Sequence, residues 1–110
     1  MIAGRLSDRI TVQRPGVVGD DTYGNPLSGW TVWHECWANI RETPGREAVQ
    51  ANRLEAARTA TIRIRKGPIA SAITTADRVL ARGRVWNIRG VALIDEGREL
   101  IEMTVEEDEV

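Results

Sequence analysis

Residues 58–66 read Arg-Thr-Ala-Thr-Ile-Arg-Ile-Arg-Lys, and this stretch decides the fold class of the chain. Ala60, Ile62 and Ile64 alternate with polar residues, and successive side chains of a strand point to opposite faces. The alternation therefore predicts a β-strand with one buried face and one solvated face. A Gly-Pro pair at 67–68 follows directly and is typical of a strand end.

The same alternation recurs on both sides of this stretch. Ile10 and Val12 alternate within residues 8–14, and further strand patterns cover 30–41, 77–81, 85–93 and 100–105. Gly83 and the Glu96–Gly97 pair are typical of tight turns between strands. About six short strands with short turns predict a mainly β protein, a small antiparallel barrel. The residues expected in its core include Ile62, Ile64, Val79, Ile88, Ile101 and Met103.

Residues 30–41 read Trp-Thr-Val-Trp-His-Glu-Cys-Trp-Ala-Asn-Ile-Arg and are apolar on both parities. The even-numbered residues include Trp30 and Cys36, whereas Trp33 and Trp37 are odd-numbered. This pattern indicates either a strand buried on both sides or a strand with a bulge that switches its faces.

Two segments depart from the strand pattern. Residues 16–29 are rich in Gly, Pro, Asp and Asn, which predicts a long loop of the kind that usually carries function. Thr43 and Pro44 suit an N-cap and a first helical position. With the apolar spacing that follows them, they predict one short α-helix over residues 43–57, inserted into the barrel.

The chain has 110 residues and a net charge of −1, which fits a single domain over residues 1–110. From Asp95 to the end, eight acidic residues face one arginine, a formal charge of −7. Residues 1–94 hold fourteen basic and eight acidic residues, a formal charge of +6. We expect residues 106–110 to form an acidic tail that is solvated or contacts the basic body of another copy. The candidates for such an inter-subunit acidic segment are Glu102, Glu106 and Glu107.

Few residues are available for catalysis or metal binding. One cysteine and one histidine exclude a disulfide framework and a four-ligand zinc site. His34 and Cys36 share a face of their strand, and a half-buried pair in the core is the favoured interpretation. Asp20, Asp21 and Asp77 are candidate carboxylates for a cation, with turn formation favoured for the adjacent pair. No phosphate loop, nucleophile elbow or metalloprotease motif is found, so we expect no enzyme, no catalytic residue, no cofactor and no metal.

The sequence also bears on location and on membrane contact. No apolar run approaches the ~18–20 residues needed to cross a bilayer, and residues 1–10 lack the apolar centre of a signal peptide. We therefore expect a soluble protein without a membrane partner that is made in the cytoplasm.

The tryptophans allow a second interpretation. Trp30, Trp33 and Trp37 on one strand suit a stacking platform for single-stranded nucleic acid. The alternative function is therefore a monomeric oligonucleotide-binding-type β-barrel. The sequence pI near 5.8 counts against it, because such domains usually carry a basic face. A place in the core or in a protein interface is favoured for these side chains.

Residues 6–105 as a whole resemble the phage head–tail joining family, the head-closure or stopper proteins that act as head–tail adaptors. The resemblance rests on the order and spacing of short runs along the chain. These runs are Arg9–Gln13, Asp21–Asn25, Trp30, Trp37–Ile40, Gly45–Glu47, Thr61–Arg65, Ile73–Val79 and Gly83–Val91. Trp86 stands where the family more usually has Tyr, and the acidic end is not part of the family pattern.

The resemblance implies a small β-barrel with an inserted helix and a structural role without catalysis or cofactor. It implies rings of six or twelve copies between the portal or adaptor protein of the capsid and the tail or tail-terminator protein. Such a ring keeps the packaged genome in the head, and double-stranded DNA passes through its lumen. The implied location is the virion of a phage, prophage or gene transfer agent, after synthesis in the bacterial cytoplasm.

A ring component of this kind needs surfaces for its neighbours and a lumen that does not grip DNA. The long loop is the candidate docking element for a partner ring, and its candidate residues are Asp20, Asp21, Tyr23, Gly24 and Asn25. The helical segment is the candidate lumen or gate segment, because its charges nearly cancel. The residues concerned are Arg46, Glu47, Arg53, Glu55 and Arg58.

Overall fold

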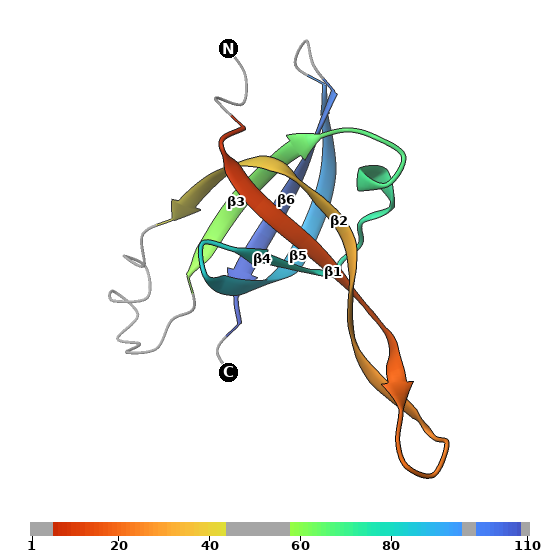
Figure 1. Ribbon diagram of the computed structural model, residues 1–110. Helices are drawn as coiled ribbons and strands as arrows, with labels where there is room; N and C mark the ends of the chain where they lie inside the picture. Colours follow the sequence, from red (N-terminus) through yellow and green to blue (C-terminus); the bar gives the residue numbers. More distant parts are fainter. Residues whose placement is uncertain (1–5, 44–57, 96–98, 109–110) are drawn as a thin grey trace.

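The structure is a computed structural model, and it describes residues 6–43, 58–95 and 99–108. These residues form six antiparallel strands (Figure 1). The strands close into a barrel in the order β1-β2-β3-β6-β5-β4. The elements are β1 (Asp8–Asp20), β2 (Pro26–Thr43), β3 (Thr59–Arg65), the 3-10 turn η1 (Ala70–Ala72), β4 (Arg78–Ala81), β5 (Arg84–Asp95) and β6 (Glu99–Glu107). The predicted mainly β fold with six antiparallel strands is confirmed.

The core lies on the inward faces of the strands. All six residues predicted to be core are buried, from Ile62 in β3 to Met103 in β6. The alternation in β3 places Ala60, Ile62 and Ile64 inside, and the hydrocarbon removed from water there stabilises the closed sheet. Trp86 fills the centre with no exposed surface, and its Nε1–H donates to the carbonyl oxygen of Ala81 at 3.1 Å.

A bulge in β2 confirms the second interpretation of residues 30–41. Val12 of β1 pairs with His34 and Gln13 pairs with Val32, so Trp33 is the extra residue. Beyond the bulge Ala38 and Ile40 point into the core, whereas Val32, before the bulge, is 60% exposed. One inserted residue thus turns the even-numbered side chains of β2 from the outside of the molecule to the inside.

The prediction of a long loop over residues 16–29 was wrong. β1 and β2 stay paired beyond the barrel and form a two-stranded arm, in which Gly16 pairs with Gly29 and Asp20 pairs with Pro26 (Figure 1). The backbone prefers this ladder because Val17 and Val18 favour strands and the glycines permit close packing. A Cβ on Gly29 would lie 2.8 Å from the Val18 side chain, so a larger residue there would have to displace Val18.

The turn at the end of the arm covers residues 21–25. The Asp21 carboxylate accepts hydrogen bonds from the backbone N–H groups of Tyr23 at 2.7 Å and Asn25 at 2.9 Å. Gly24 takes a φ of 83°, which a side chain would strain. The Asp and Gly residues predicted to make a loop therefore make the turn of a hairpin.

Two further predicted segments were a helix and an acidic tail. The expected helix over residues 43–57 falls mostly on 44–57, outside the described residues, and Thr43 is the last residue of β2, paired with Thr59. The prediction of an acidic tail over residues 106–110 was wrong for Glu106 and Glu107, because both belong to β6. They continue the strand because Glu106 pairs with both Thr59 of β3 and Asn87 of β5.

We predict that Ile62→Ala lowers the free energy of unfolding by about 2–5 kcal/mol, because it leaves a cavity among fully buried side chains. Thr61→Ala, one residue away on the outer face of β3, should change it by less than about 0.5 kcal/mol. Urea denaturation followed by tryptophan fluorescence measures both. Equal losses for the two variants would contradict the assigned strand faces.

Candidate interaction surface

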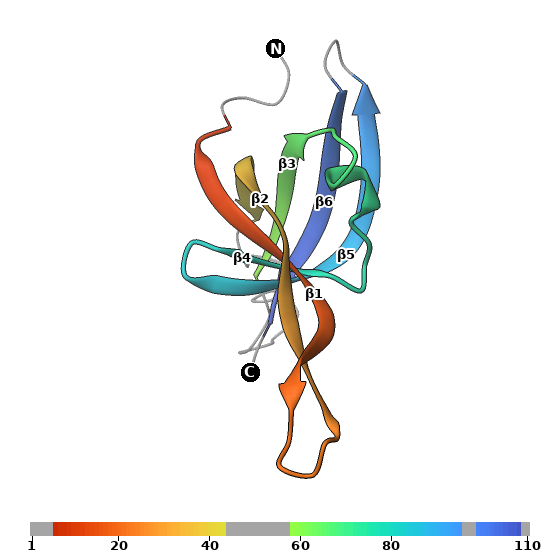
Figure 2. The same cartoon turned by 45° about the vertical axis from the view of Figure 1, so that its right-hand side comes forward.

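The arm carries the candidate docking residues at its end. Asp20, Asp21, Tyr23, Gly24 and Asn25 come together at the turn, which we call the tip, residues 20–25. Tyr23 is 89% exposed, far beyond what a tyrosine packed on its own subunit shows. The arm projects away from the barrel in both views (Figure 2). Its length lets the tip reach a surface that the barrel itself does not touch.

The rest of the arm, residues 14–19 and 26–32, is called the stem, and its two faces differ. Pro15 pairs with Trp30 and Val17 pairs with Ser28, so these side chains share the face that continues the outside of the barrel. Val32 lies on the same face of β2, two residues from Trp30. We call Pro15, Val17, Trp30 and Val32 the stem face; Val17 is 64% exposed and Val32 60% exposed.

Arginines cover the tryptophans of β2, an arrangement that sequence reasoning missed. The Arg78 guanidinium lies 4.2 Å from the ring centroid of Trp30 and donates to the Gln13 side chain at 2.8 Å. The Arg9 guanidinium lies 5.4 Å from the ring of Trp37. These partners come from strands whose register no spacing in the sequence specifies. Each guanidinium lies over one face of its ring and so competes there with the stacking of a nucleobase.

The third tryptophan, Trp33, belongs to a partly buried ion-pair cluster. Arg14 donates to both carboxylate oxygens of Asp77 at 2.9 Å and to the carbonyl of Ala72 at 2.7 Å. Its guanidinium lies 3.8 Å from the centroid of the Trp33 ring, and Trp33 Nε1–H donates to the Ile69 carbonyl at 3.1 Å. The cluster ties β1 and β2 to the connection between β3 and β4, where the arm leaves the barrel.

Asp77 is charged in this cluster. Burial acts to raise the pKa of Asp77, but the hydrogen bonds from Arg14 and from the Thr74 backbone N–H, with the charge of Arg14, outweigh it. The pKa therefore lies below its ordinary value. Asp77 has a structural partner in place of a cation.

Asp21, another candidate cation ligand, stabilises the turn of the arm. Hydrogen bonds from the backbone N–H groups of Asn25 and Tyr23 hold the pKa of Asp21 below its ordinary value. No group of three His, Cys, Asp or Glu side chains that could bind a metal exists within residues 6–43, 58–95 and 99–108. The turn interpretation of the Asp20–Asp21 pair therefore fits the geometry of the tip.

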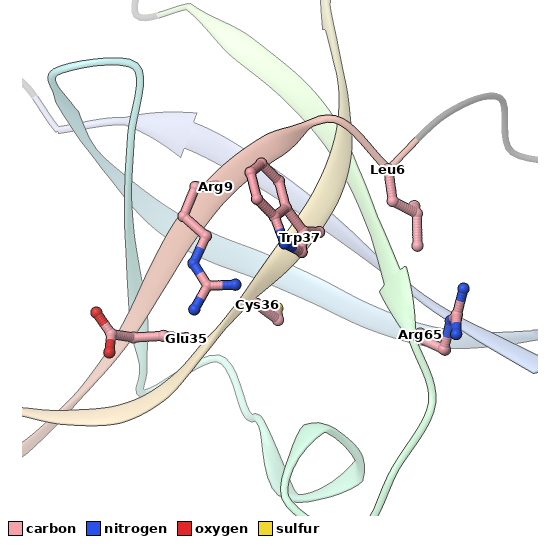
Figure 3. Close-up of a pocket in the computed structure, with 6 residues that line it drawn as sticks. All are labelled: Leu6, Arg9, Glu35, Cys36, Trp37 and Arg65. Atoms are coloured by element: carbon pink, nitrogen blue, oxygen red, sulfur yellow. The ribbon is translucent and has the colours of Figure 1, made fainter.

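Cys36 lines an open pocket between β1, β2 and β3. Figure 3 shows Trp37 at its centre, with Arg9 and Glu35 to one side and Leu6 and Arg65 to the other. Burial raises the pKa of the Cys36 thiol, which works against a reactive thiolate. Cys36 packs partly against the core, as the structural interpretation of the His34–Cys36 pair predicts.

The acidic residues of β6 pair with arginines of their own chain. Arg63 donates to Glu102 at 2.8 Å, and Arg89 donates to Glu106 at 2.8 Å. Glu107 lies 3.3 Å from Arg84. Much of the negative charge of this segment is therefore balanced within the subunit, and the expected contact with a second copy has to compete with these pairs.

Arg58 is the single candidate lumen residue that the structure describes. It is exposed, lies 3.4 Å from Glu42 and 3.9 Å from Glu107, and donates to Glu42. Arg82 donates to Glu42 at 2.8 Å, and this bond, followed by that of Arg58, lowers the pKa of Glu42. Arg46, Glu47, Arg53 and Glu55 lie outside the described residues.

The described part of the chain is a closed β-barrel with a projecting arm and with arginines stacked on the tryptophans of β2. The chain matches the family model of the phage head completion protein over residues 1–108, and it belongs to that family. Its role is a structural one in the phage head, and its place is the virion.

Solved structures with the same fold include the following two. Protein SF1141 from Shigella flexneri 2a is 32% identical, with a TM-score of 0.66 over 97% of this chain and 96% of that one. A chain from the virion of a native gene transfer agent particle is 18% identical, with a TM-score of 0.63 over 93% of this chain and 94% of that one. Comparison with curated proteins gives no match. No helix in the described ranges is long and apolar enough to cross a membrane.

We predict that Asp77→Asn destabilises the protein at neutral pH and that the loss disappears in acid. The folded pKa of Asp77 lies below the unfolded value of about 3.9. Its carboxylate thus stabilises the fold above that value, and the contribution is lost as the pH falls through the folded pKa. Urea denaturation at a series of pH values measures this, with Asp20→Asn in the exposed tip as the control. A gap between wild type and Asp77→Asn that stays constant down to about pH 2 would contradict the ion pair.

Proposed function

We infer that the protein forms a ring that joins the DNA-filled head to the tail. In this proposal, six or twelve copies sit between the portal or adaptor protein and the tail or tail-terminator protein, and the ring closes the head. Membership of the phage head completion family supports the assignment to the head. The observation that carries the joining role is the arm, which offers an exposed tip at a distance from a stable barrel.

The tip is the proposed contact with an adjoining ring. Tyr23 is the aromatic residue there, and its 89% exposure leaves a large side chain to be buried by a partner. Aromatic residues that become buried at the centre of an interface supply much of its binding energy. The Asp21 hydrogen bonds hold the turn in one shape before binding, which lowers the entropy cost of docking.

The lumen is proposed to pass double-stranded DNA without holding it. Arg58 supports this, because the structure engages it with Glu42 and Glu107 and so reduces the positive charge it presents. A ring whose lumen gripped phosphates tightly would slow the passage of the genome. Segment 44–57 stays the candidate for lining or gating the channel.

Native mass spectrometry of the purified chain, alone and with the portal–adaptor complex encoded nearest to it, tests the proposal. We expect six or twelve copies, either alone or on the complex. A monomer that ignores the complex would overturn the joining role. If that monomer also binds single-stranded DNA and quenches its tryptophan fluorescence, the oligonucleotide-binding alternative takes its place.

We predict that Tyr23→Ser weakens binding to the portal–adaptor complex or to the tail partner by about tenfold or more. The melting temperature should not change, because Tyr23 makes few contacts within its own subunit. Thr22→Ala, next to it in the same turn, is the matched control and should bind like wild type. Biolayer interferometry on both partners measures the loss, and unchanged binding of Tyr23→Ser to both would remove the tip from the proposal.

A further inference from the structure

The second half of β5, from Val91 onward, exposes apolar side chains on its inner face, the face that is buried elsewhere in the barrel. Val91 pairs with Met103 and Leu93 pairs with Ile101, so all four side chains share the inner face of the sheet. Met103 and Ile101 are buried, but Val91 is 37% exposed and Leu93 is 56% exposed. Nothing in the described residues covers this end of the inner face, which we call the β5 face, Val91 and Leu93.

The β5 face is uncovered because its neighbouring strand is short. β4 pairs with β5 from Arg84 to Asn87, and no strand in the described ranges pairs with that edge of β5 further on. The turn η1 lies beside this half of β5 in both views and buries Ala70, while Ile69 before it stays 47% exposed (Figures 1 and 2). Within the described ranges, this edge of β5 therefore has no strand partner beyond Asn87, beside apolar side chains that are exposed.

The stem has the matching properties. Its face carries Pro15, Val17 and Val32, which its own subunit leaves exposed, and Trp30, which is 38% exposed with Arg78 stacked on one side of its ring. Gln13 is the last residue of β1 that pairs with β4, so the outer edge of β1 from Arg14 to Asp20 lacks a strand partner in the described structure. The two open edges, residues 14–20 and 88–95, are of similar length.

One copy cannot join these two surfaces. The arm leaves one end of the molecule, and the end of β5 lies at the opposite end, in a chain 53 Å long (Figures 1 and 2). We propose that the stem of one copy lies along the open edge of β5 in a second copy and covers Val91 and Leu93. This contact rests on the ring proposed above and names the surfaces that would build it.

The contact is head-to-tail, as a ring requires. Each copy contributes its stem to one neighbour and its β5 face to the other, so the interface is heterologous and repeats around a closed rotation. Charge complementarity favours the orientation in which the tip of one copy points toward the end of β5 in the other. Asp20 and Asp21 then approach Arg65, the last residue of β3, which lies in the row of Leu100 and Ile94. Lys66 follows it but already lies 3.6 Å from Glu99, so Arg65 supplies the main attraction. The tip itself extends past the neighbour and stays available to an adjoining ring.

Two variants, each blocking one surface, test the contact in the full chain. Val17→Asp places a charge on the stem face, and Leu93→Lys places one on the β5 face. We expect each to weaken self-association by about tenfold or more in a concentration series by sedimentation velocity. The matched controls are Val18→Asp, on the opposite face of the arm, and Ala92→Lys, on the outer face of β5, and both should associate like wild type.

Mixing the two variants gives the sharpest result. The stem of Leu93→Lys and the β5 face of Val17→Asp are both intact, so the mixture should form heterodimers, whereas each variant alone stays monomeric. Growth beyond the heterodimer would bring the two substituted surfaces together, and because Val17→Asp and Leu93→Lys introduce opposite charges, Leu93→Glu is used beside Leu93→Lys so that the two blocked surfaces repel each other. Formation of the heterodimer also shows that both variants are folded, and Leu93→Ser repeats the test with a milder change.

Three results would overturn the contact. These are a wild-type chain that stays monomeric up to its solubility limit, equal effects of Val17→Asp and Val18→Asp, and a mixture that stays monomeric. The proposed function has a separate readout. If both blocking variants still form rings of the wild-type copy number on the portal–adaptor complex, this contact is wrong while the joining role stands. If wild type itself ignores the complex, the joining role is wrong.

Discussion

The ion pair between Arg14 and Asp77 is the interaction on which the shape of the molecule depends. It sits where β1 leaves the barrel, and the Asp77 side chain has no exposed surface. Removing Arg14 would leave the buried Asp77 carboxylate without its opposite charge, so the pair holds β1 against the connection that precedes β4. The same guanidinium reaches the Ala72 carbonyl and stacks on Trp33. One side chain of β1 thus contacts β2 through Trp33 and the connection between β3 and β4 at two points, and so holds the base of the arm on the barrel.

The bulge at Trp33 complements this cluster. A regular β2 would place Val32 on the same face as His34, toward the inside of the sheet. The extra residue reverses the faces, turns Trp33 toward Arg14 and η1, and leaves Trp30 and Val32 on the outside. The bulge therefore converts a core strand into an arm with an exposed apolar face, without a break in pairing.

Much of the barrel could be predicted from the sequence because burial imposes a period of two on each strand. β3 shows this most clearly, since Ala60, Ile62 and Ile64 are all buried as the alternation predicts. The arm could not be predicted in the same way. Its side chains are exposed on both faces, so no burial pattern marks the strands, and its glycines suit loops and hairpins equally.

The residues of the candidate interaction surface could also be predicted only where the sequence has a local pattern. The tip residues could be found, because Asp and Gly at a turn have a local signature in the sequence. The arginines over Trp30, Trp33 and Trp37 could not, because Arg78, Arg14 and Arg9 reach them through strand register. The pairing of Glu102, Glu106 and Glu107 with Arg63, Arg89 and Arg84 likewise depends on which strands are neighbours.

The barrel and the contact surfaces have separate physical origins, and this separation suits an assembly protein. The stability of the subunit comes from a core centred on Trp86 and Ile62, which no proposed contact touches. The arm adds little to that core, so its exposed residues can be shaped for partners without loss of the fold. Exposed apolar side chains on a stable subunit cost solubility and gain nothing until they are covered. Their presence on both the stem and β5 is therefore best explained by partners that bury them in the virion.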